Sequence, residues 1–453
     1  MCGLVMSDWN EAERRVERAQ ELFEQRKWSE ALDELRAATH INPYNSGWHF
    51  NIGLTLDEMG RIDEAIEAYR EVLSIDPNDV QAMNHLGVDL HRTEKYEQAL
   101  DVFQTIEGVD STFEPSYCNR IITYTQLGNH ERAEEMFYLA RLYKDHCPHC
   151  YYNIGCSLFD RELYDKAIYC WQKTLDLDEL HPEVHLRIAE AMWNKGDFEQ
   201  ARRHYLSGLR QDPGCLEALL DLGELLCEMG RNEEAGEKFR RAIEMAPDKP
   251  DGHYAYARWL LRYAQKEEEA AAAFVKTLRL DPTFSGAHLH LAQVAFRRGE
   301  LIETRAHLRG EILLRPLETD VLLALANLLM DTGESRAAVA CLKRLVQLDR
   351  DNPSAWINLA VAQFIRGRYE QGIDAGLMAL SCEPENTLAM YNLALAYEQM
   401  GRYEEAMHWV RKGLGRDQSD NAFQRLQFRI KVLRMRSRVV RNVRRVLRLS
   451  VGP

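Results

Sequence analysis

One short segment, His146-Cys147-Pro148-His149-Cys150, holds residue types that commonly carry metal or redox chemistry. Two thiols separated by two residues resemble the redox pair of disulfide oxidoreductases, in which a helix N-terminus lowers a thiol pKa. Two Cys and two His this close could also bind zinc, although one Cys-x-x-Cys without a matching second pair is a weak zinc signal. The segment also suits a plain turn, because proline commonly starts a helix. We favour the structural turn and keep metal binding and redox sensitivity at Cys147 and Cys150 as alternatives.

Two further cysteines, Cys118 and Cys156, are expected on helices that flank this segment. Elsewhere the chain offers no glycine-rich phosphate loop after a strand and no nucleophile elbow. The histidines show no metalloprotease spacing. We therefore predict a protein that is not an enzyme and that needs no cofactor.

The elements that would position these residues follow a repeat of 34 residues. Pro43 and Pro77 are 34 residues apart, as are Pro213 and Pro247, whereas Pro247 and Pro282 are 35 apart. Aromatic and alanine side chains keep the same period at Tyr69, Phe103, Phe137, Trp171, Tyr205 and Phe239, and at Ala31, Ala65, Ala99, Ala133, Ala167, Ala201 and Ala235. A fixed period of this length indicates a repeat architecture.

Each period contains two amphipathic helices. In residues 46–78, Ile52 and Leu56 share one apolar stripe, and Tyr69 and Val72 share another. Gly60 separates the two stripes and supplies a helix stop. The spacing predicts a pair of helices in every period, with small residues where the two backbones approach each other.

This pattern resembles the tetratricopeptide repeat family, whose consensus appears in residues 216–249 as Leu219, Leu222, Gly223, Leu226, Ala235, Phe239, Ala242 and Pro247. Twelve such units would tile residues 12–420, with one extra residue near 250–270, after a short lead at 1–11. The resemblance implies an all-α, right-handed superhelical solenoid of about twelve helix-turn-helix repeats with a concave groove. It also implies a non-catalytic scaffold or adaptor that binds peptide segments of partner proteins. The cysteine usage favours a cytoplasmic setting.

The family register places one face of each first helix in that groove. Aromatic side chains expected there include Phe50, Tyr152, Trp193, Tyr254 and Tyr391, interspersed with Glu190, Glu224, Glu228 and Asp320. Such a groove would suit a peptide with some basic residues. For each aromatic residue, ordinary packing between helices is an equally good interpretation.

Asparagines occupy one equivalent place in five repeats: Asn51, Asn119, Asn153, Asn358 and Asn392. They resemble the asparagine ladder of the repeat domain of O-linked N-acetylglucosamine transferases, where amides can hold a peptide backbone. The row is interrupted here by His85, Arg187, Asp221, His290 and Ala324, so two short runs are expected rather than a continuous ladder.

The last part of the chain, residues 421–453, differs from the repeats. It carries nine Arg and one Lys and no acidic residue, whereas the chain as a whole has a net charge of -14. Its first half is expected to be a capping helix. The second half could bind an anionic membrane surface or nucleic acid, or fold back on the acidic solenoid, through Arg436, Arg438, Arg441, Arg444, Arg445 and Arg448.

Composition is that of a folded protein, with 45% hydrophobic and 28% charged residues. The apolar runs are too short for a membrane span, and the start, whether Met1 or Met6, lacks the features of a signal peptide. The ten cysteines are too dilute for a disulfide scaffold, so a reducing compartment and small core cysteines are expected. Oligomeric state and partner identity cannot be read from the sequence.

Overall fold

The computed structural model describes residues 2–143 and 146–449, with side chains for residues 9–143 and 146–439. Over these residues the chain is an all-α solenoid of twenty-five α-helices and one π-helical turn, without any strand. None of these helices is both long and apolar enough to cross a membrane. The chain forms two compact units, residues 1–231 and 232–453.

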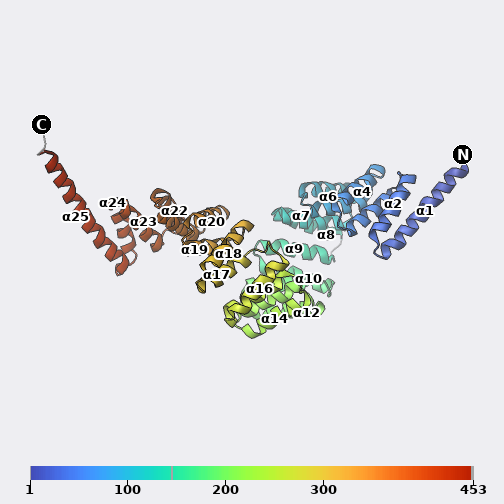
Figure 1. The fold of residues 1–453 in the computed structure, drawn as a ribbon. Helices are drawn as coiled ribbons and strands as arrows, with labels where there is room; N and C mark the ends of the chain where they lie inside the picture. The colour runs from blue at the N-terminus through green and yellow to red at the C-terminus, as the bar shows by residue number, and fades with distance from the viewer. Residues whose placement is uncertain (1, 144–145, 450–453) are drawn as a thin grey trace. The chain divides into compact units, whose positions relative to one another are not determined.

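The first unit contains thirteen helices, and neighbours in sequence lie side by side (Figure 1). Their bounds are α1 Cys2–Glu24, α2 Trp28–Ile41, α3 Ser46–Glu58, α4 Ile62–Ile75, α5 Val80–Arg92, α6 Tyr96–Val109, α7 Glu114–Gln126, α8 His130–Tyr143, α9 Pro148–Asp160, α10 Tyr164–Leu177, α11 Val184–Asn194, α12 Phe198–Gln211 and α13 Leu216–Glu228.

The second unit continues the same alternation and ends in a long helix. Its bounds are α14 Asn232–Met245, α15 Pro250–Trp259, the π-helical turn η1 Leu260–Ala264, α16 Glu267–Leu280, α17 Ala287–Arg297, α18 Leu301–Leu314, α19 Thr319–Asp331, α20 Ser335–Leu348, α21 Pro353–Ile365, α22 Tyr369–Cys382, α23 Thr387–Gln399, α24 Tyr403–Leu414 and α25 Asn421–Leu449.

The turn inside each helix pair has one residue with a positive φ, which favours glycine. Gly60 has this role between α3 and α4, with φ +72°, as the sequence predicted. Eight of the twelve turns use glycine there, at residues 60, 128, 196, 230, 299, 333, 367 and 401. The other four place a side chain in the same conformation, at Arg26, Glu94, Glu162 and Gln265. The repeat therefore fixes the backbone of this turn even where its residue type departs from glycine.

Small residues permit the close packing expected within each pair. A Cβ added to Gly53 would lie 2.5 Å from Cε1 of Tyr69, and one added to Gly155 would lie 2.4 Å from Nε1 of Trp171. Both aromatic side chains are fully buried. Glycine on the first helix thus makes room for a large ring on the second, because a protein interior leaves no spare volume.

Odd-numbered helices form the inner side of each unit. Helices two apart in sequence contact each other at α5–α7 and α7–α9 in the first unit, and at α17–α19, α19–α21 and α21–α23 in the second. The first helices of successive repeats therefore contact one another along the inner side, as the resemblance implied.

Two details differ from or refine the sequence interpretation. Helix α1 already begins at Cys2, so residues 2–11, expected as a separate lead, belong to the first helix. The extra residue expected near 250–270 coincides with the π-helical turn Leu260–Ala264, which ends at Gln265 with φ +54°. A π-turn absorbs one added residue without ending the helix pair.

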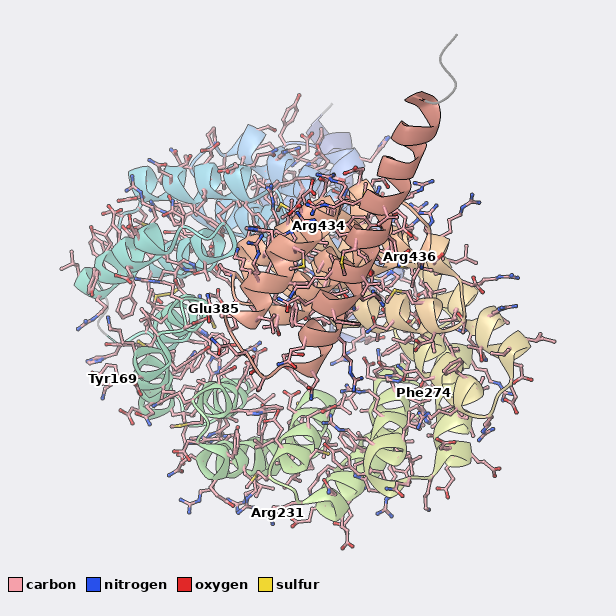
Figure 2. The ribbon with its side chains drawn as sticks, turned by 90° about the vertical axis from the view of Figure 1, so that its left-hand side faces the viewer. Tyr169, Arg231, Phe274, Glu385, Arg434 and Arg436 are labelled. Carbon is pink, nitrogen blue, oxygen red and sulfur yellow. A yellow bond between two sulfur atoms is a disulfide. The ribbon has the colours of Figure 1, made fainter. Side chains whose placement is uncertain are left out.

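The long helix α25 covers the last repeat with its first half. Asp420 caps it, since its Oδ1 accepts from the backbone N–H of Ala422 at 2.7 Å. Phe423, Leu426 and Ile430 are buried against the preceding helices. The later turns of α25, on which Figure 2 labels Arg434 and Arg436, extend past the helices that its first half covers.

Candidate functional site

The aromatic side chains predicted for the groove are half-buried and pack mainly against neighbouring rings. Phe50 meets Tyr69 and His85, with ring centroids 5.7 and 5.4 Å apart. Tyr152 stacks on His181 at 4.7 Å, and its hydroxyl donates to Glu183. Much of their surface is therefore used in the packing of one repeat on the next.

The other three predicted aromatics also contact neighbouring rings. The Tyr254 ring lies 4.8 Å from that of Phe284, and Tyr391 packs edge-on against Phe423 at 5.3 Å. Trp193 packs edge-on against Tyr205 at 6.4 Å, and its indole N–H also donates to Glu228 Oε2 at 2.7 Å, which links α11 to α13. Its ring therefore stands next to acidic groups on the inner side of the first unit.

The asparagines make three separate contacts rather than a continuous row. Asn119 Nδ2 donates to Asn84 Oδ1 at 2.9 Å, and Asn358 Nδ2 donates to Asn327 Oδ1 at 2.8 Å. Asn153 Nδ2 donates to the carbonyl of Cys118 at 3.0 Å. These amides hold neighbouring first helices together, while Asn392 is half-buried on α23.

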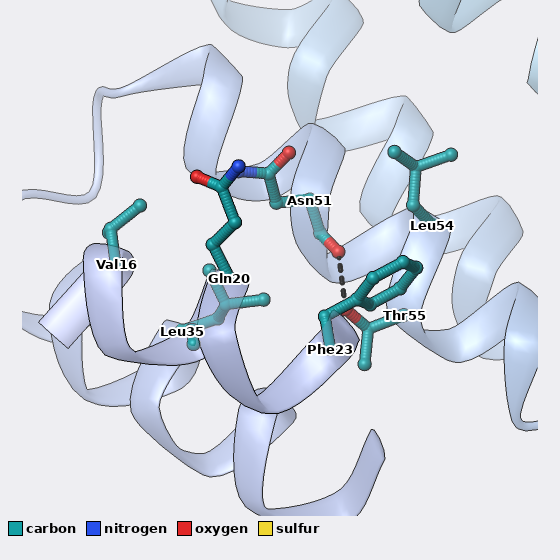
Figure 3. Close-up of a pocket in the computed structure, with 8 residues that line it drawn as sticks. Val16, Gln20, Phe23, Leu35, Asn51, Leu54 and Thr55 are labelled. Atoms are coloured by element: carbon teal, nitrogen blue, oxygen red, sulfur yellow. Dashed lines mark hydrogen bonds between the residues drawn. The ribbon is translucent and has the colours of Figure 1, made fainter. Parts of the chain in front are cut away.

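Asn51 occupies a different setting, at the mouth of a pocket between the first three helices. The pocket has a volume of about 240 Å³ and an apolar lining that includes Val16, Phe23 and Leu35. Figure 3 shows the side-chain amides of Gln20 and Asn51 pointing toward one another above this lining. An apolar hollow with amides at its edge can accept an apolar side chain and bind the adjacent peptide backbone.

An acidic cluster lies farther along the inner side of the first unit, on α11 and α13. Asp221 is half-buried, and burial followed by the negative charges of Glu217, Glu190 and Glu224 raises its pKa to about 6. Glu190 is paired with Arg187 at 3.0 Å, whereas Asp221 has no basic partner among the described residues. The cluster therefore keeps a negative charge that is only partly compensated.

The cysteine segment belongs to a compact group of four side chains. Glu114 and Cys118 lie one turn apart on α7, Cys147 is the N-cap of α9, and Cys150 lies in its first turn. Their ligand atoms all lie within 4.8 Å of one another. Cys118 and Cys150 form a disulfide, and the Cys147 sulfur lies 3.4 Å from that of Cys118. The expectation that the cysteines are unpaired core residues is thus wrong for Cys118 and Cys150, because the repeat brings α7 against α9.

The surroundings of this group are apolar. The three cysteines are 1% to 6% exposed and belong to one buried hydrophobic cluster with Tyr117 and Trp171. Burial, together with a hydrogen bond to Glu114, raises the pKa of the Cys147 thiol to about 11. His146 and His149 are exposed and stand outside the group, and so does Cys156. The predicted Cys147–Cys150 pair is therefore joined by Cys118 and Glu114, not by the histidines.

The basic side chains of the last helix fall into two parts. Arg429 forms a bidentate pair with the buried Glu398, with both distances 2.5 Å, and Arg434 pairs with Glu404. Arg436 and Arg438 are exposed. The side chains of Arg441, Arg444, Arg445 and Arg448 lie outside the described residues. The described arginine pairs attach α25 to its own acidic repeats.

Three residues of these candidate sites were not singled out from the sequence: Glu114, Asp221 and Gln20. Glu114 gave no signal, because an acidic residue at a helix start is common. Asp221 was noted only as an interruption of the asparagine row. Gln20 comes from α1, opposite Asn51, and only the packing of α1 on α3 brings the two together. Cys118 did offer a signal, since it occupies the place of Phe50 and Tyr152 in the repeat.

Curated relatives match limited stretches of the chain. Human protein O-mannosyl-transferase TMTC3 is 27% identical over 185 residues, which are 40% of this chain and 20% of that protein. The chain thus spans about a fifth of the length of the curated relatives it matches.

Among solved structures, a crystal structure of the APC/C hetero-tetramer Cut9-Hcn1 is similar over 91% of this chain and 95% of that one, with 14% identity and a TM-score of 0.41. Yeast Tom70 is similar over 97% and 99%, with 13% identity and a TM-score of 0.41.

Family-level comparison covers more of the chain than the curated relatives do. Sequence profiles described as tetratricopeptide repeat match residues 48–79, 186–250, 285–309, 323–386 and 377–430, more than half of the chain. These stretches lie in both units and follow the helix pairs described above. With its 34-residue period, its paired helices and these matches, the chain belongs to the tetratricopeptide repeat family.

Proposed function

We propose that this protein is a non-catalytic interaction scaffold, and that the inner side of its first unit binds a peptide segment of a partner protein in which basic residues stand between apolar ones. The observation that carries the proposal is the half-buried carboxyl of Asp221 among Glu190, Glu217 and Glu224. A lysine or arginine docked there would favour the ionised form that burial disfavours.

Two other parts of the first unit suit the rest of such a peptide. Trp193 lies beside the cluster through its bond to Glu228, and an indole face can hold an apolar or cationic side chain. In the same unit, the pocket below Gln20 and Asn51 offers an apolar hollow with amides at its edge. A binding surface that alternates apolar and acidic groups reads a peptide that alternates apolar and basic ones.

Selection of a random displayed peptide library on the full chain tests this proposal. Enriched peptides should contain Lys or Arg beside apolar residues. Asp221→Asn should weaken binding of an enriched synthetic peptide by about 10-fold or more, because a hydrogen bond to a charged group contributes about 1.5–3 kcal/mol. Asp165→Asn is a matched control, since Asp165 is exposed on α10, a second helix.

The pH dependence of binding gives an independent readout. The pKa of Asp221 is about 6, so its carboxyl is neutral below that pH and charged above it. Affinity for a Lys- or Arg-containing peptide should therefore rise between pH 5 and pH 7.5 in the native chain, and this rise should shrink in Asp221→Asn. Enriched peptides without basic residues, or unchanged affinity in Asp221→Asn, would contradict the proposal.

A further inference from the structure

Three buried sulfurs and a carboxylate meet where the fourth and fifth repeats join. Cys118 and Cys150 are paired in a disulfide, which accounts for two of the three sulfurs. A third sulfur, from Cys147, lies 3.4 Å from the sulfur of Cys118, and Glu114 Oε1 lies 3.3 Å from the same atom. A disulfide sulfur has no hydrogen to donate, so the approach of Glu114 to Cys118 is a close contact that gathers one carboxylate and three sulfurs at a single point.

We propose that Glu114, Cys118, Cys147 and Cys150 form a tetrahedral zinc site in the reduced protein. Zinc prefers four ligands from Cys, His and carboxylate groups, with Zn–S distances of about 2.3 Å, which separate the ligand atoms by about 3.5–4 Å. The four ligand atoms here lie within 4.8 Å of one another. Thiolate ligands also select zinc over magnesium or calcium, which prefer oxygen.

The fold prepares this group for a cation in two ways. Cys147 is the N-cap of α9, and its sulfur accepts from the backbone N–H of Cys150 at 3.3 Å, so this N–H offsets part of the cost that burial places on a charged sulfur. The surrounding cluster of Tyr117, Ile121, Ile154 and Trp171 is apolar and buried. Such a shell keeps water from competing for the ligands.

Zinc binding and the disulfide exclude one another, because both use Cys118 and Cys150. Reduction by a dithiol breaks the Cys118–Cys150 bond, adds two electrons and two protons to give two thiols, and converts the dithiol to its own disulfide. Zn²⁺ then displaces the protons of the three thiols and binds their sulfurs with the Glu114 carboxylate. Zinc would thus join α7 to α9 through ligands from both helices.

The test uses the full chain, purified under a phosphine reductant without chelator and analysed for zinc. We expect about one zinc per chain, and Co²⁺ in its place should show thiolate-to-cobalt charge-transfer absorption. Cys118→Ser, Cys147→Ser and Cys150→Ser should each reduce zinc to below about one tenth of an equivalent. Cys170→Ser is the matched control, because Cys170 is buried in the same cluster but lies outside the group of four.

Thiol alkylation of the folded native chain provides a second test, which does not depend on whether a serine variant folds. Zinc should protect Cys118, Cys147 and Cys150 from alkylation, and a chelator should expose them together, as read by peptide mass spectrometry. The proposal is overturned if the reduced native chain binds neither zinc nor cobalt, if zinc leaves the labelling of these three cysteines unchanged, or if Cys170→Ser loses zinc equally.

Discussion

The fifth repeat, residues 148–181, and the eleventh, residues 353–386, follow equivalent turns but differ in the residue that caps the first helix. In the eleventh, Asn352 Oδ1 accepts from the backbone N–H of Ala355 at 3.0 Å, an ordinary helix N-cap. In the fifth, Cys147 Sγ occupies that place, and Cys150 stands where Ala355 does. Sulfur is a weak acceptor, so cysteine is a poor choice for a cap alone. The cap of the fifth repeat is thus a sulfur that also belongs to the group of Glu114, Cys118 and Cys150.

The two repeats also fill their cores differently. In the fifth, Trp171 on the second helix fills the space left by Gly155 on the first. In the eleventh, Gly376 takes the place of Trp171, and the Phe364 ring approaches Gly372 instead, where an added Cβ would lie 2.3 Å from its Cε1. The two repeats thus differ in which helix supplies the large side chain beside a glycine.

The prediction with the largest expected effect tests this difference in packing between the two repeats. Trp171→Ala should lower the free energy of unfolding by about 3–5 kcal/mol, because it empties a fully buried site. Phe364→Ala should cost less, about 2 kcal/mol, because Phe364 is only half-buried. Repeat arrays can unfold in parts, so native-state hydrogen exchange at α10 and α22 is the suitable measurement.

Tyr169 provides the control for this prediction, since it lies on the same helix as Trp171 and is 59% exposed (Figure 2). Tyr169→Ala should change the stability by less than about 0.5 kcal/mol. Equal losses in Trp171→Ala and Phe364→Ala would show that the two repeats pack more alike than their residues indicate.

A smaller effect on stability is expected from the difference between the two helix N-caps, Asn352 and Cys147. Asn352→Ala should destabilise α21 by about 1 kcal/mol, since one backbone N–H loses its acceptor. Cys147→Asn introduces the cap of the eleventh repeat into the fifth. With chelator and reductant present, it should leave stability unchanged or raise it by up to about 1 kcal/mol. With zinc present, the same change should lower the unfolding temperature, because a ligand is lost.

Thermal unfolding of both variants with zinc and with chelator distinguishes these outcomes. Asn352→Asp serves as the conservative control, because a carboxylate caps a helix about as well as an amide does. If Cys147→Asn has the same effect in zinc and in chelator, Cys147 is only a cap and the contrast between the two turns loses its functional meaning.

The sequence predicted the repeated elements well and the local groups poorly, for a physical reason. Helix pairs, the turn at Gly60 and an extra residue near 250–270 follow from periodicity, because the same contacts recur in every repeat. The approach of Cys118 to Cys150 joins residues 32 apart in sequence and depends on the departure of one repeat from the rest. Periodicity carries no information about a contact that occurs once.

The asparagines illustrate the same limit. Their equivalence predicted a shared role, yet Asn119 binds Asn84 and Asn358 binds Asn327, while Asn51 faces a pocket. Asn84 and Asn327 stand outside the equivalent place, which in those repeats holds His85 and Ala324. The role of each amide thus depends on which residue its neighbour offers.

The smallest expected effect concerns the turn within each of the two repeats. Glu162 in the fifth has φ +59°, and its counterpart Gly367 in the eleventh has φ +70°. Glu162→Gly should stabilise the chain by about 0.5–1 kcal/mol, because relief of left-handed strain exceeds the added flexibility of the unfolded chain. Gly367→Ala should destabilise by about 1 kcal/mol, and only through the backbone, since an added Cβ would meet nothing within 4 Å.

Denaturant unfolding of the two variants, with Glu162→Asn as an intermediate control, measures this contrast, because asparagine tolerates a positive φ better than glutamate does. Glu162 is exposed, so loss of its side chain should have little effect of its own. If Glu162→Gly destabilises the chain while Gly367→Ala is neutral, the two turns do not share one backbone conformation in solution. Opposite signs of the expected size would instead show that the repeat imposes this turn on whatever residue occupies it.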